Sequence, residues 1–227
     1  MLKAVIFDMD GGVIDGETIH FEANKKVLAD MGKELGYDYY RQFIGGTLTG
    51  MWEVMQKDGM VASDLTIDEL NGLSYAATNA LLEANGGYPP VKGACELVKE
   101  LRKSDMKMAI ASSSMYERIE RTAKSLGVDD CFDVYVSGEQ LKRPKPAPDI
   151  FIKAAELLGV SPSECIVIED SGNGVNAAKA AGMACVGYIN PGSGDQDLSA
   201  ADYLVESLEG LETSFFNMVH AHCNGEP

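Results

Sequence analysis

The sequence predicts an α/β fold in which helices cover a parallel sheet and an all-helical segment is inserted near the N-terminus. Short, continuously apolar runs of strand length recur along the chain, and apolar residues at helical spacing (i, i+3, i+4, i+7) occupy the stretches between them. The stretch after the first run contains helical patterns only. Continuous apolar strands that alternate with helices are typical of a parallel sheet buried on both faces.

Six apolar runs are the expected strands: residues 4–7, 106–111, 134–136, 165–168, 184–187 and 203–205. Apolar stripes indicate helices within three of the intervening stretches: residues 94–101, 119–126 and 150–158. Strand and helix therefore alternate through most of the chain, as the α/β class requires.

The inserted segment extends from Asp15 to about Gly86. A capping box of Thr66 with Glu69 opens one of its predicted helices. Glycine at position 16 and a Gly-Gly-Tyr-Pro-Pro run from Gly86 indicate hinges at its two ends. We therefore expect a catalytic core of residues 1–16 and 88–227, and a helical cap of residues 17–87.

The chain is strongly acidic, with 19 Lys and Arg against 35 Asp and Glu and a net charge of −16. This charge disfavours nucleic acid and anionic membranes as partners, because both are bound through basic patches. The five cysteines form no C-x-x-C pair, which favours reduced thiols over a zinc site or redox motif. No apolar run is long enough for a signal peptide or a membrane span. We expect a cytoplasmic monomer.

Acidic residues follow two of the predicted strands. Asp8 and Asp10 come directly after the first strand, and Glu169 with Asp170 follow the fourth. A lone D-x-D is equally well explained as a polar turn. Ligands of open parallel sheets, however, bind at the carboxyl ends of the strands, where these carboxylates can converge. Paired carboxylates need a cation, and oxygen ligands alone select a hard one such as Mg²⁺.

Groups that suit a bound phosphate follow the same edge of the sheet. Ser112 ends the second strand, beside the backbone N–H groups at a helix start. Ser114 and Glu117 form a capping box, which predicts Ser114 as the helix N-cap with no further role. Lys145 lies between prolines that fix its backbone. A hydroxyl, helix amides and a lysine near a cation together indicate phosphoryl transfer to a carboxylate.

Two glycines and an alanine after the fourth strand also match the dinucleotide-binding pattern G-x-G-x-x-A. They are Gly172, Gly174 and Ala177. Two carboxylates immediately before them would repel a pyrophosphate, so a closely packed helix start is the better interpretation.

Four motifs, in order and spacing, resemble those of the haloacid dehalogenase-like phosphatase superfamily: Asp8-Met9-Asp10-Gly11, Ser112, Lys145 in Lys-Pro-Ala-Pro-Asp, and Glu169-Asp170. The resemblance extends over nearly the whole chain and implies a Rossmann-like core with a helical cap. Asp15-Gly16-Glu17 with His20, and the position of the insertion, are similar to the branch that contains β-phosphoglucomutase and small sugar-phosphate phosphatases.

The resemblance also implies roles for the motif residues. Asp8 would attack phosphorus and become an aspartyl phosphate, and Asp10 would protonate the leaving oxygen and then deprotonate the attacking water. Asp8 and Asp170 would bind Mg²⁺, with Glu169 as a ligand or beside one. The remaining metal and phosphate contacts would come from the Asp10 backbone carbonyl and from Ser112, Ser113 and Lys145. The cap would close over the site and select the substrate, with His20 and Gly46 as candidate contacts.

Two residues depart from the superfamily pattern. Gly12 replaces a residue that is usually β-branched, which would loosen the turn after the catalytic pair. Pro144 stands where glycine is frequent, which would stiffen the lysine loop.

The expected cap separates a phosphatase from a mutase. Residues 17–87 carry five basic and eleven acidic side chains, a net charge of −6, and residues 45–50 include no basic residue. Mutase relatives hold the second phosphate of a bisphosphate with basic cap residues. We therefore expect a phosphatase that acts on a small, singly phosphorylated metabolite, with a phosphoglucomutase-type mutase as the alternative.

A receiver domain, which carries a phosphoaspartate but is not an enzyme, would also combine acids, a hydroxyl and a lysine around Mg²⁺. Its lysine follows all the acids in the chain, whereas Lys145 precedes Glu169, and it has no cap insertion.

Overall fold

The structure is a computed structural model that describes residues 1–44, 48–61 and 64–225. The chain divides into two compact units. One contains Met1–Asp15 and Pro89–Pro227, and the other contains Gly16–Tyr88.

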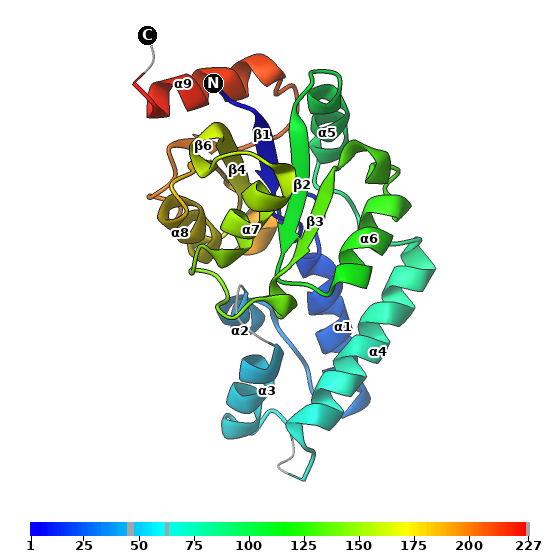
Figure 1. Cartoon of the computed structure of the whole chain (residues 1–227). Coiled ribbons are helices and arrows are strands. Elements are labelled where there is room, and N and C mark those ends of the chain that lie inside the picture. Colours follow the sequence, from blue (N-terminus) through cyan, green and yellow to red (C-terminus); the bar gives the residue numbers. More distant parts are fainter. Residues whose placement is uncertain (45–47, 62–63, 226–227) are drawn as a thin grey trace. The chain divides into compact units, whose positions relative to one another are not determined.

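The first unit, which we call the core unit, is built on a parallel sheet of six strands with the order β3-β2-β1-β4-β5-β6 (Figure 1). The strands are β1 (Ala4–Phe7), β2 (Lys107–Ser112), β3 (Val134–Ser137), β4 (Cys165–Glu169), β5 (Ala184–Tyr188) and β6 (Tyr203–Val205). The predicted α/β class and all six apolar runs are confirmed, with boundaries that differ by one residue at most.

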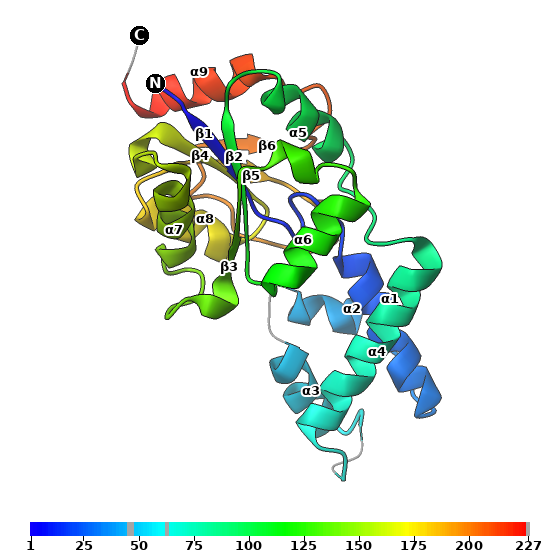
Figure 2. The same ribbon diagram turned by 45° about the vertical axis from the view of Figure 1, so that its right-hand side comes forward.

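Helices lie on both faces of this sheet. They are α5 (Ala94–Arg102), α6 (Tyr116–Ser125), α7 (Asp149–Leu158), α8 (Gly172–Ala180) and α9 (Thr213–Cys223). Some of the connections contain short 3₁₀ turns, which are η2 (Asp129–Cys131), η3 (Gly138–Gln140), η4 (Pro162–Glu164) and η5 (Pro191–Ser193). Figures 1 and 2 show α7 and α8 on one face and α5 and α6 on the other. No helix in the described residues is long and apolar enough to cross a membrane.

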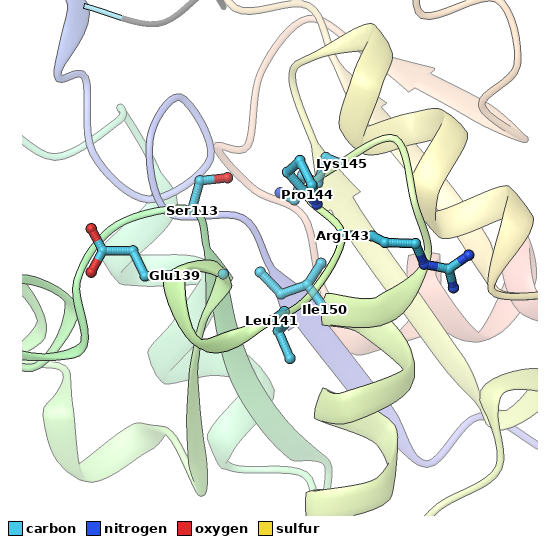
Figure 3. A pocket seen from close by; sticks show the side chains of 8 residues that line it. Ser113, Glu139, Leu141, Arg143, Pro144, Lys145 and Ile150 are labelled. Atoms are coloured by element: carbon cyan, nitrogen blue, oxygen red, sulfur yellow. The ribbon is translucent and has the colours of Figure 1, made fainter.

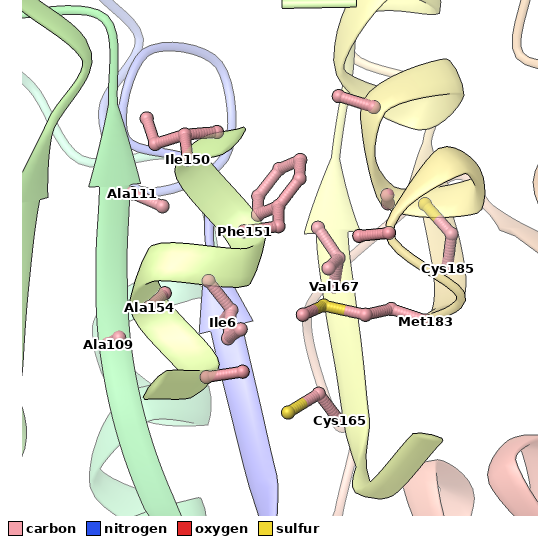
Figure 4. Packing of buried hydrophobic residues seen from close by; sticks show 14 of the residues in the cluster. Ile6, Ala109, Ala111, Ile150, Phe151, Ala154, Cys165, Val167, Met183 and Cys185 are labelled. Atoms are coloured by element: carbon pink, nitrogen blue, oxygen red, sulfur yellow. The ribbon is translucent and has the colours of Figure 1, made fainter. Parts of the chain in front are cut away.

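The face covered by α7 shows why the strands are apolar along their whole length. Ile6 and Ala109 point from the sheet toward Phe151 and Ala154 of α7, and all four side chains are fully buried (Figure 4). Successive strand residues point to opposite faces, so the neighbours of Ile6 are buried against the other helix layer. Burial on both faces requires the continuous apolar runs that the sequence contains.

The second unit, which we call the helical unit, contains α1 (Glu17–Asp30), α2 (Tyr37–Tyr40), the 3₁₀ turn η1 (Arg41–Phe43), α3 (Leu48–Lys57) and α4 (Ile67–Asn85). It has a hydrophobic core of its own around Trp52, whose indole N–H donates to Ser74 Oγ at 3.1 Å. The predicted capping box is present at the start of α4. Thr66 Oγ1 accepts from the Glu69 N–H, and the Glu69 carboxylate accepts from the Thr66 N–H.

Strand register brings the candidate motifs to one edge of the sheet. β1 lies between β2 and β4, and Phe7 at its end is level with Ile110 and Ile168. The residues that follow these three positions therefore lie side by side at the carboxyl ends of the strands. This is the point where the strand order reverses direction, the usual ligand position of an open α/β sheet.

Candidate active site

Three buried carboxylates form a cluster at the carboxyl ends of β1 and β4. Asp8 follows β1, Glu169 ends β4 and Asp170 follows it, and one oxygen of each lies within 4.8 Å of the others. The pKa of Asp8 is raised well above its usual value by burial and by its two acidic neighbours, although Lys145 opposes this. Burial and the charge of Glu169 raise the pKa of Asp170 to about 7. An oxygen-only donor set with this much mutual repulsion suits a hard divalent cation.

Lys145 is the basic partner of this cluster. Its Nζ lies 2.5 Å from Asp8 Oδ1 and 2.5 Å from Glu169 Oε1, and it stands 4.9 Å from the centre of the Phe151 ring. Burial alone would lower the pKa of Lys145, but the charges of Asp8 and Glu169 outweigh it and raise this pKa above its usual value. Lys145 therefore stays protonated and brings a fixed positive charge to Asp8.

Glu169 links Lys145 to the turn between β4 and α8. Its Oε1 accepts from Lys145, and its Oε2 accepts from the backbone N–H groups of Asp170 and Ser171 and from the Ser171 hydroxyl. Its side chain lies directly over Gly174, where an added Cβ would be 1.7 Å from Oε1. Gly174 therefore makes room for the carboxylate, which gives the second glycine of the G-x-G pattern a packing role.

Asp170 is held by groups from two other loops. Ser193 Oγ donates a hydrogen bond to Asp170 Oδ2. Gly11 has a φ of +93°, and an added Cβ there would lie 1.8 Å from the same oxygen, so only glycine allows this approach. Asn190 fixes Gly11 by donating from Nδ2 to its carbonyl at 3.1 Å. Ser193 and Asn190 were not predicted from the sequence, although their position just after β5 placed them at the same edge of the sheet.

Asp10 faces a different set of partners. Its Oδ1 accepts from Arg118 Nη2 at 2.6 Å, and its Oδ2 lies 3.1 Å from Ser114 Oγ and 3.5 Å from Ser112 Oγ. The three-carboxylate cluster does not include Asp10, and a metal contact from its backbone carbonyl stays a prediction. Arg118 carries no motif signal and was not anticipated.

The predicted N-cap role of Ser114 is wrong. Helix α6 begins at Tyr116 with Met115 as its N-cap, and no side chain caps it. The Ser114 hydroxyl instead accepts from Arg118 Nη1 at 2.7 Å and donates to the Asp10 carboxylate. Hydrogen bonds to the charged side chains of Asp10 and Arg118 are stronger than a hydrogen bond to a neutral backbone N–H, which explains why Ser114 does not cap the helix.

Ser113 lies on the wall of a pocket of about 200 Å³ that also includes Lys145 and Pro144 (Figure 3). Its side chain is exposed, whereas Ser112 is almost fully buried and accepts from the Ser114 N–H at 3.1 Å. Arg143 also lines the pocket, but its guanidinium pairs with Asp149. The pocket thus brings two of the three expected phosphate contacts, Ser113 and Lys145, to one place.

Comparisons with known proteins identify the family. Residues 2–182 match the family model described as haloacid dehalogenase-like hydrolase. The chain belongs to the haloacid dehalogenase-like hydrolase family. This confirms the family expected from the sequence, and with it an enzyme of the hydrolase class.

Two relatives of this hydrolase are named for different reactions, one for hydrolysis and one for isomerisation. A phosphorylated carbohydrates phosphatase of Thermotoga maritima is 35% identical over 187 residues, which are 80% of this chain and 82% of the relative. The β-phosphoglucomutase of Bacillus subtilis is 30% identical over 213 residues, or 92% of each chain. The crystal structure of CbbY from Rhodobacter sphaeroides in complex with phosphate superposes with a TM-score of 0.77 at 25% identity, covering 93% of this chain and 96% of that one.

The two departures of this haloacid dehalogenase-like hydrolase from the superfamily pattern have different settings. A Cβ added to Gly12 would lie 2.5 Å from the Asp8 carbonyl oxygen, so this turn requires glycine. Pro144 accepts from the Ala147 N–H at 2.9 Å within the lysine loop.

The structure describes one of the two expected cap contacts. His20 belongs to α1 of the helical unit, where its ring is 5.9 Å from the ring of Tyr88. Gly46 lies outside the described residues.

Proposed function

We propose that the protein is a Mg²⁺-dependent phosphomonoester hydrolase that acts on a small phosphorylated sugar through an aspartyl phosphate on Asp8. The observation that carries this proposal is the position of Asp8. Its carboxylate is buried at the reversal point of the sheet, in contact with Lys145 and within 4.8 Å of Glu169 and Asp170. A nucleophilic carboxylate with a fixed cation and two acids beside it suits attack on an anionic phosphoryl group.

The acidic cluster would hold the metal through Asp8 and Asp170, with Glu169 next to them. A Mg²⁺ ion held there would offset the negative charge of the phosphoryl oxygens. Glu169 already accepts four hydrogen bonds, so its main contribution would be to orient Lys145 and the turn that carries Asp170. The protein's own residues carry the remaining steps.

In the first step, Asp8 forms a bond to phosphorus and the bond from phosphorus to the ester oxygen breaks. Asp10 gives its proton to the departing oxygen. In the second step, a water molecule loses a proton to Asp10 and attacks phosphorus, which releases inorganic phosphate and restores Asp8. Lys145, Ser112 and Ser113 hold the phosphoryl oxygens in both steps, where the ammonium group offsets the charge that spreads over them.

The substrate class rests on the relatives and on charge. One relative is named for phosphorylated carbohydrates, and the acidic segment 17–87 offers few cations for a second phosphate. Mutase activity is the second candidate, because β-phosphoglucomutase of B. subtilis aligns over 92% of the chain.

The experiment is a panel of sugar monophosphates with Mg²⁺, in which free phosphate and isomeric products are both measured. We expect free phosphate from at least one sugar phosphate and no turnover by Asp8→Asn. The matched control, Asp105→Asn, changes an exposed carboxylate of the core unit and should retain full activity. Isomer without free phosphate would replace the hydrolase with the mutase, and turnover by Asp8→Asn would refute the nucleophile.

A further inference from the structure

The Asp10 carboxylate is held by two residues, Arg118 and Ser114, that belong to none of the four motifs. Arg118 Nη2 donates to Asp10 Oδ1 at 2.6 Å, while Arg118 Nη1 donates to Ser114 Oγ at 2.7 Å. Ser114 Oγ in turn donates to Asp10 Oδ2 at 3.1 Å. The guanidinium, the hydroxyl and the carboxylate therefore form a closed ring of hydrogen bonds, which we call the Asp10 clamp.

The clamp is built on fixed backbone. Ser114 donates its N–H to Ser112 Oγ at 3.1 Å, and its carbonyl accepts from Ser137 Oγ at 2.7 Å, so it is anchored to the ends of both β2 and β3. Arg118 lies in the first turn of α6, four residues after Ser114, which brings its side chain back over that serine. All of these residues belong to the core unit.

The two oxygens of Asp10 consequently have different surroundings. Arginine only donates hydrogen bonds and stays charged in proteins, so Oδ1 must remain an acceptor while Arg118 is bound to it. Oδ2 faces a hydroxyl that can donate or accept, and it lies 3.5 Å from Ser112 Oγ, one of the proposed phosphate contacts. Only Oδ2 is therefore arranged to carry a proton beside the phosphoryl group.

We propose that Arg118 is a positioning residue that, together with Ser114, orients Asp10 and selects Oδ2 as the oxygen that exchanges the proton. This inference rests on the proposed phosphatase function, since it concerns the acid and base of that reaction. Without Arg118, the carboxylate could rotate about its own axis and swing away from Ser112. The proton transfer would slow, whereas attack by Asp8 would be unaffected.

Two aryl phosphates separate these effects. p-Nitrophenyl phosphate releases an acidic phenol that leaves without a proton, whereas phenyl phosphate releases a phenol with a pKa of about 10, like that of tyrosine, and needs one. kcat/KM reports the steps through release of the phenol, so the ratio of the two kcat/KM values measures proton donation. We would determine this ratio for wild type, Arg118→Ala, Arg118→Lys, Ser114→Ala and the control Arg121→Ala, an exposed arginine of the same helix.

We expect Arg118→Ala to lower kcat/KM for phenyl phosphate about tenfold, which is part of the ~10²–10⁴-fold contribution of acid–base catalysis, and to lower that for p-nitrophenyl phosphate less than about threefold. Arg118→Lys should recover part of the loss, because it keeps the charge but has no planar fork. Ser114→Ala should show the same selective loss in a smaller degree, and Arg121→Ala should match wild type.

A double-mutant cycle with Asp10→Ala tests whether Arg118 acts through Asp10. Arg118→Ala should cause no further loss on phenyl phosphate in that background. Equal losses on both substrates, or the same loss in the Asp10→Ala background, would overturn the positioning role. If Arg118→Ala does not fold, the ratio of the two kcat/KM values is measured for Arg118→Lys and Ser114→Ala instead, and each should still lose more activity on phenyl phosphate than on p-nitrophenyl phosphate. Failure of the proposed function is distinguishable, because wild type would then hydrolyse neither ester or Asp8→Asn would remain active.

Discussion

Lys145 and Glu169 form a buried ion pair, with Lys145 Nζ 2.5 Å from Glu169 Oε1 and side chains that are 9% and 1% exposed. The same Nζ also contacts Asp8, so one ammonium group is shared between a proposed nucleophile and a carboxylate that otherwise accepts from two backbone N–H groups and the Ser171 hydroxyl. Removing one member of a buried pair is costly because the other charge is left without compensation. Glu169 therefore supports the site mainly by holding Lys145.

Replacing Glu169 with Gln should lower the free energy of unfolding and the activity together. The amide retains the shape but loses the charge that Lys145 and three further donors face, which should cost about 1–3 kcal/mol. Urea denaturation of the metal-free protein measures the effect. Glu156→Gln is the matched control, because Glu156 belongs to an exposed pair with Lys153 and should change stability by no more than about 1 kcal/mol. A similar loss in both variants would contradict the special role of Glu169.

Mg²⁺ should stabilise the folded protein in addition to activating it. A ligand that binds only the folded state at about 100 times its Kd adds about 2.7 kcal/mol. We expect a rise in Tm on addition of Mg²⁺, loss of activity with EDTA, and no rise for Asp170→Asn. Asp105→Asn, which removes an exposed carboxylate elsewhere in the core unit, should keep the whole Tm shift. A Tm shift that persists in Asp170→Asn would place the bound metal elsewhere.

Part of the site was predictable because its residues follow neighbouring parallel strands at the carboxyl edge of the sheet. Asp8, Glu169 and Asp170 were found because polar residues directly after buried strands must emerge together at the carboxyl edge. Arg118 was missed because helical periodicity identifies only the buried side of α6, such as Ile119, and carries no information about which of the other residues turns back toward Asp10. Such contacts depend on tertiary geometry that local patterns do not contain.

The role of Ser114 was predicted wrongly because a local sequence pattern does not show long-range contacts. A capping box is a local signal, and it predicted the function of a hydroxyl from residues three positions apart. The structure gives that hydroxyl to Asp10, which is 104 residues away in sequence. The capping box at Thr66 was predicted correctly because its hydroxyl is engaged within the box itself, by Glu69.

Stability of the metal-free protein should fall as pH rises through neutrality. The pKa of Asp170 is raised to about 7 in the folded state from an ordinary value of 3.8, and that of Asp8 is raised as well. A raised carboxyl pKa means that folding favours the protonated form, so this stability is fully present below about pH 4 and is lost as pH approaches 7. Lys145 contributes nothing in this window, because its pKa lies far above it.

Urea denaturation between pH 5 and pH 8 in EDTA measures this dependence. We expect a decline in the free energy of unfolding that is smaller in Asp170→Asn, because one titrating group is removed. Mg²⁺ should flatten the decline, since a bound cation favours the ionised carboxylates. A metal-free protein that becomes more stable over this range would contradict the repulsion inferred for the cluster.

Gly174→Ala should reduce stability and activity, although alanine normally favours a helix. The added Cβ would lie 1.7 Å from Glu169 Oε1, so either α8 or the carboxylate must shift, and overpacking of this kind costs about 1–3 kcal/mol. Displacing Glu169 would also move Lys145 away from Asp8. Gly72→Ala is the matched control, since Gly72 lies within α4, is exposed and has no atom within 4 Å of the added Cβ. It should stabilise the protein by about 0.5–1 kcal/mol. Equal gains in both variants would show that Glu169 can move without cost and would remove the packing explanation for Gly174.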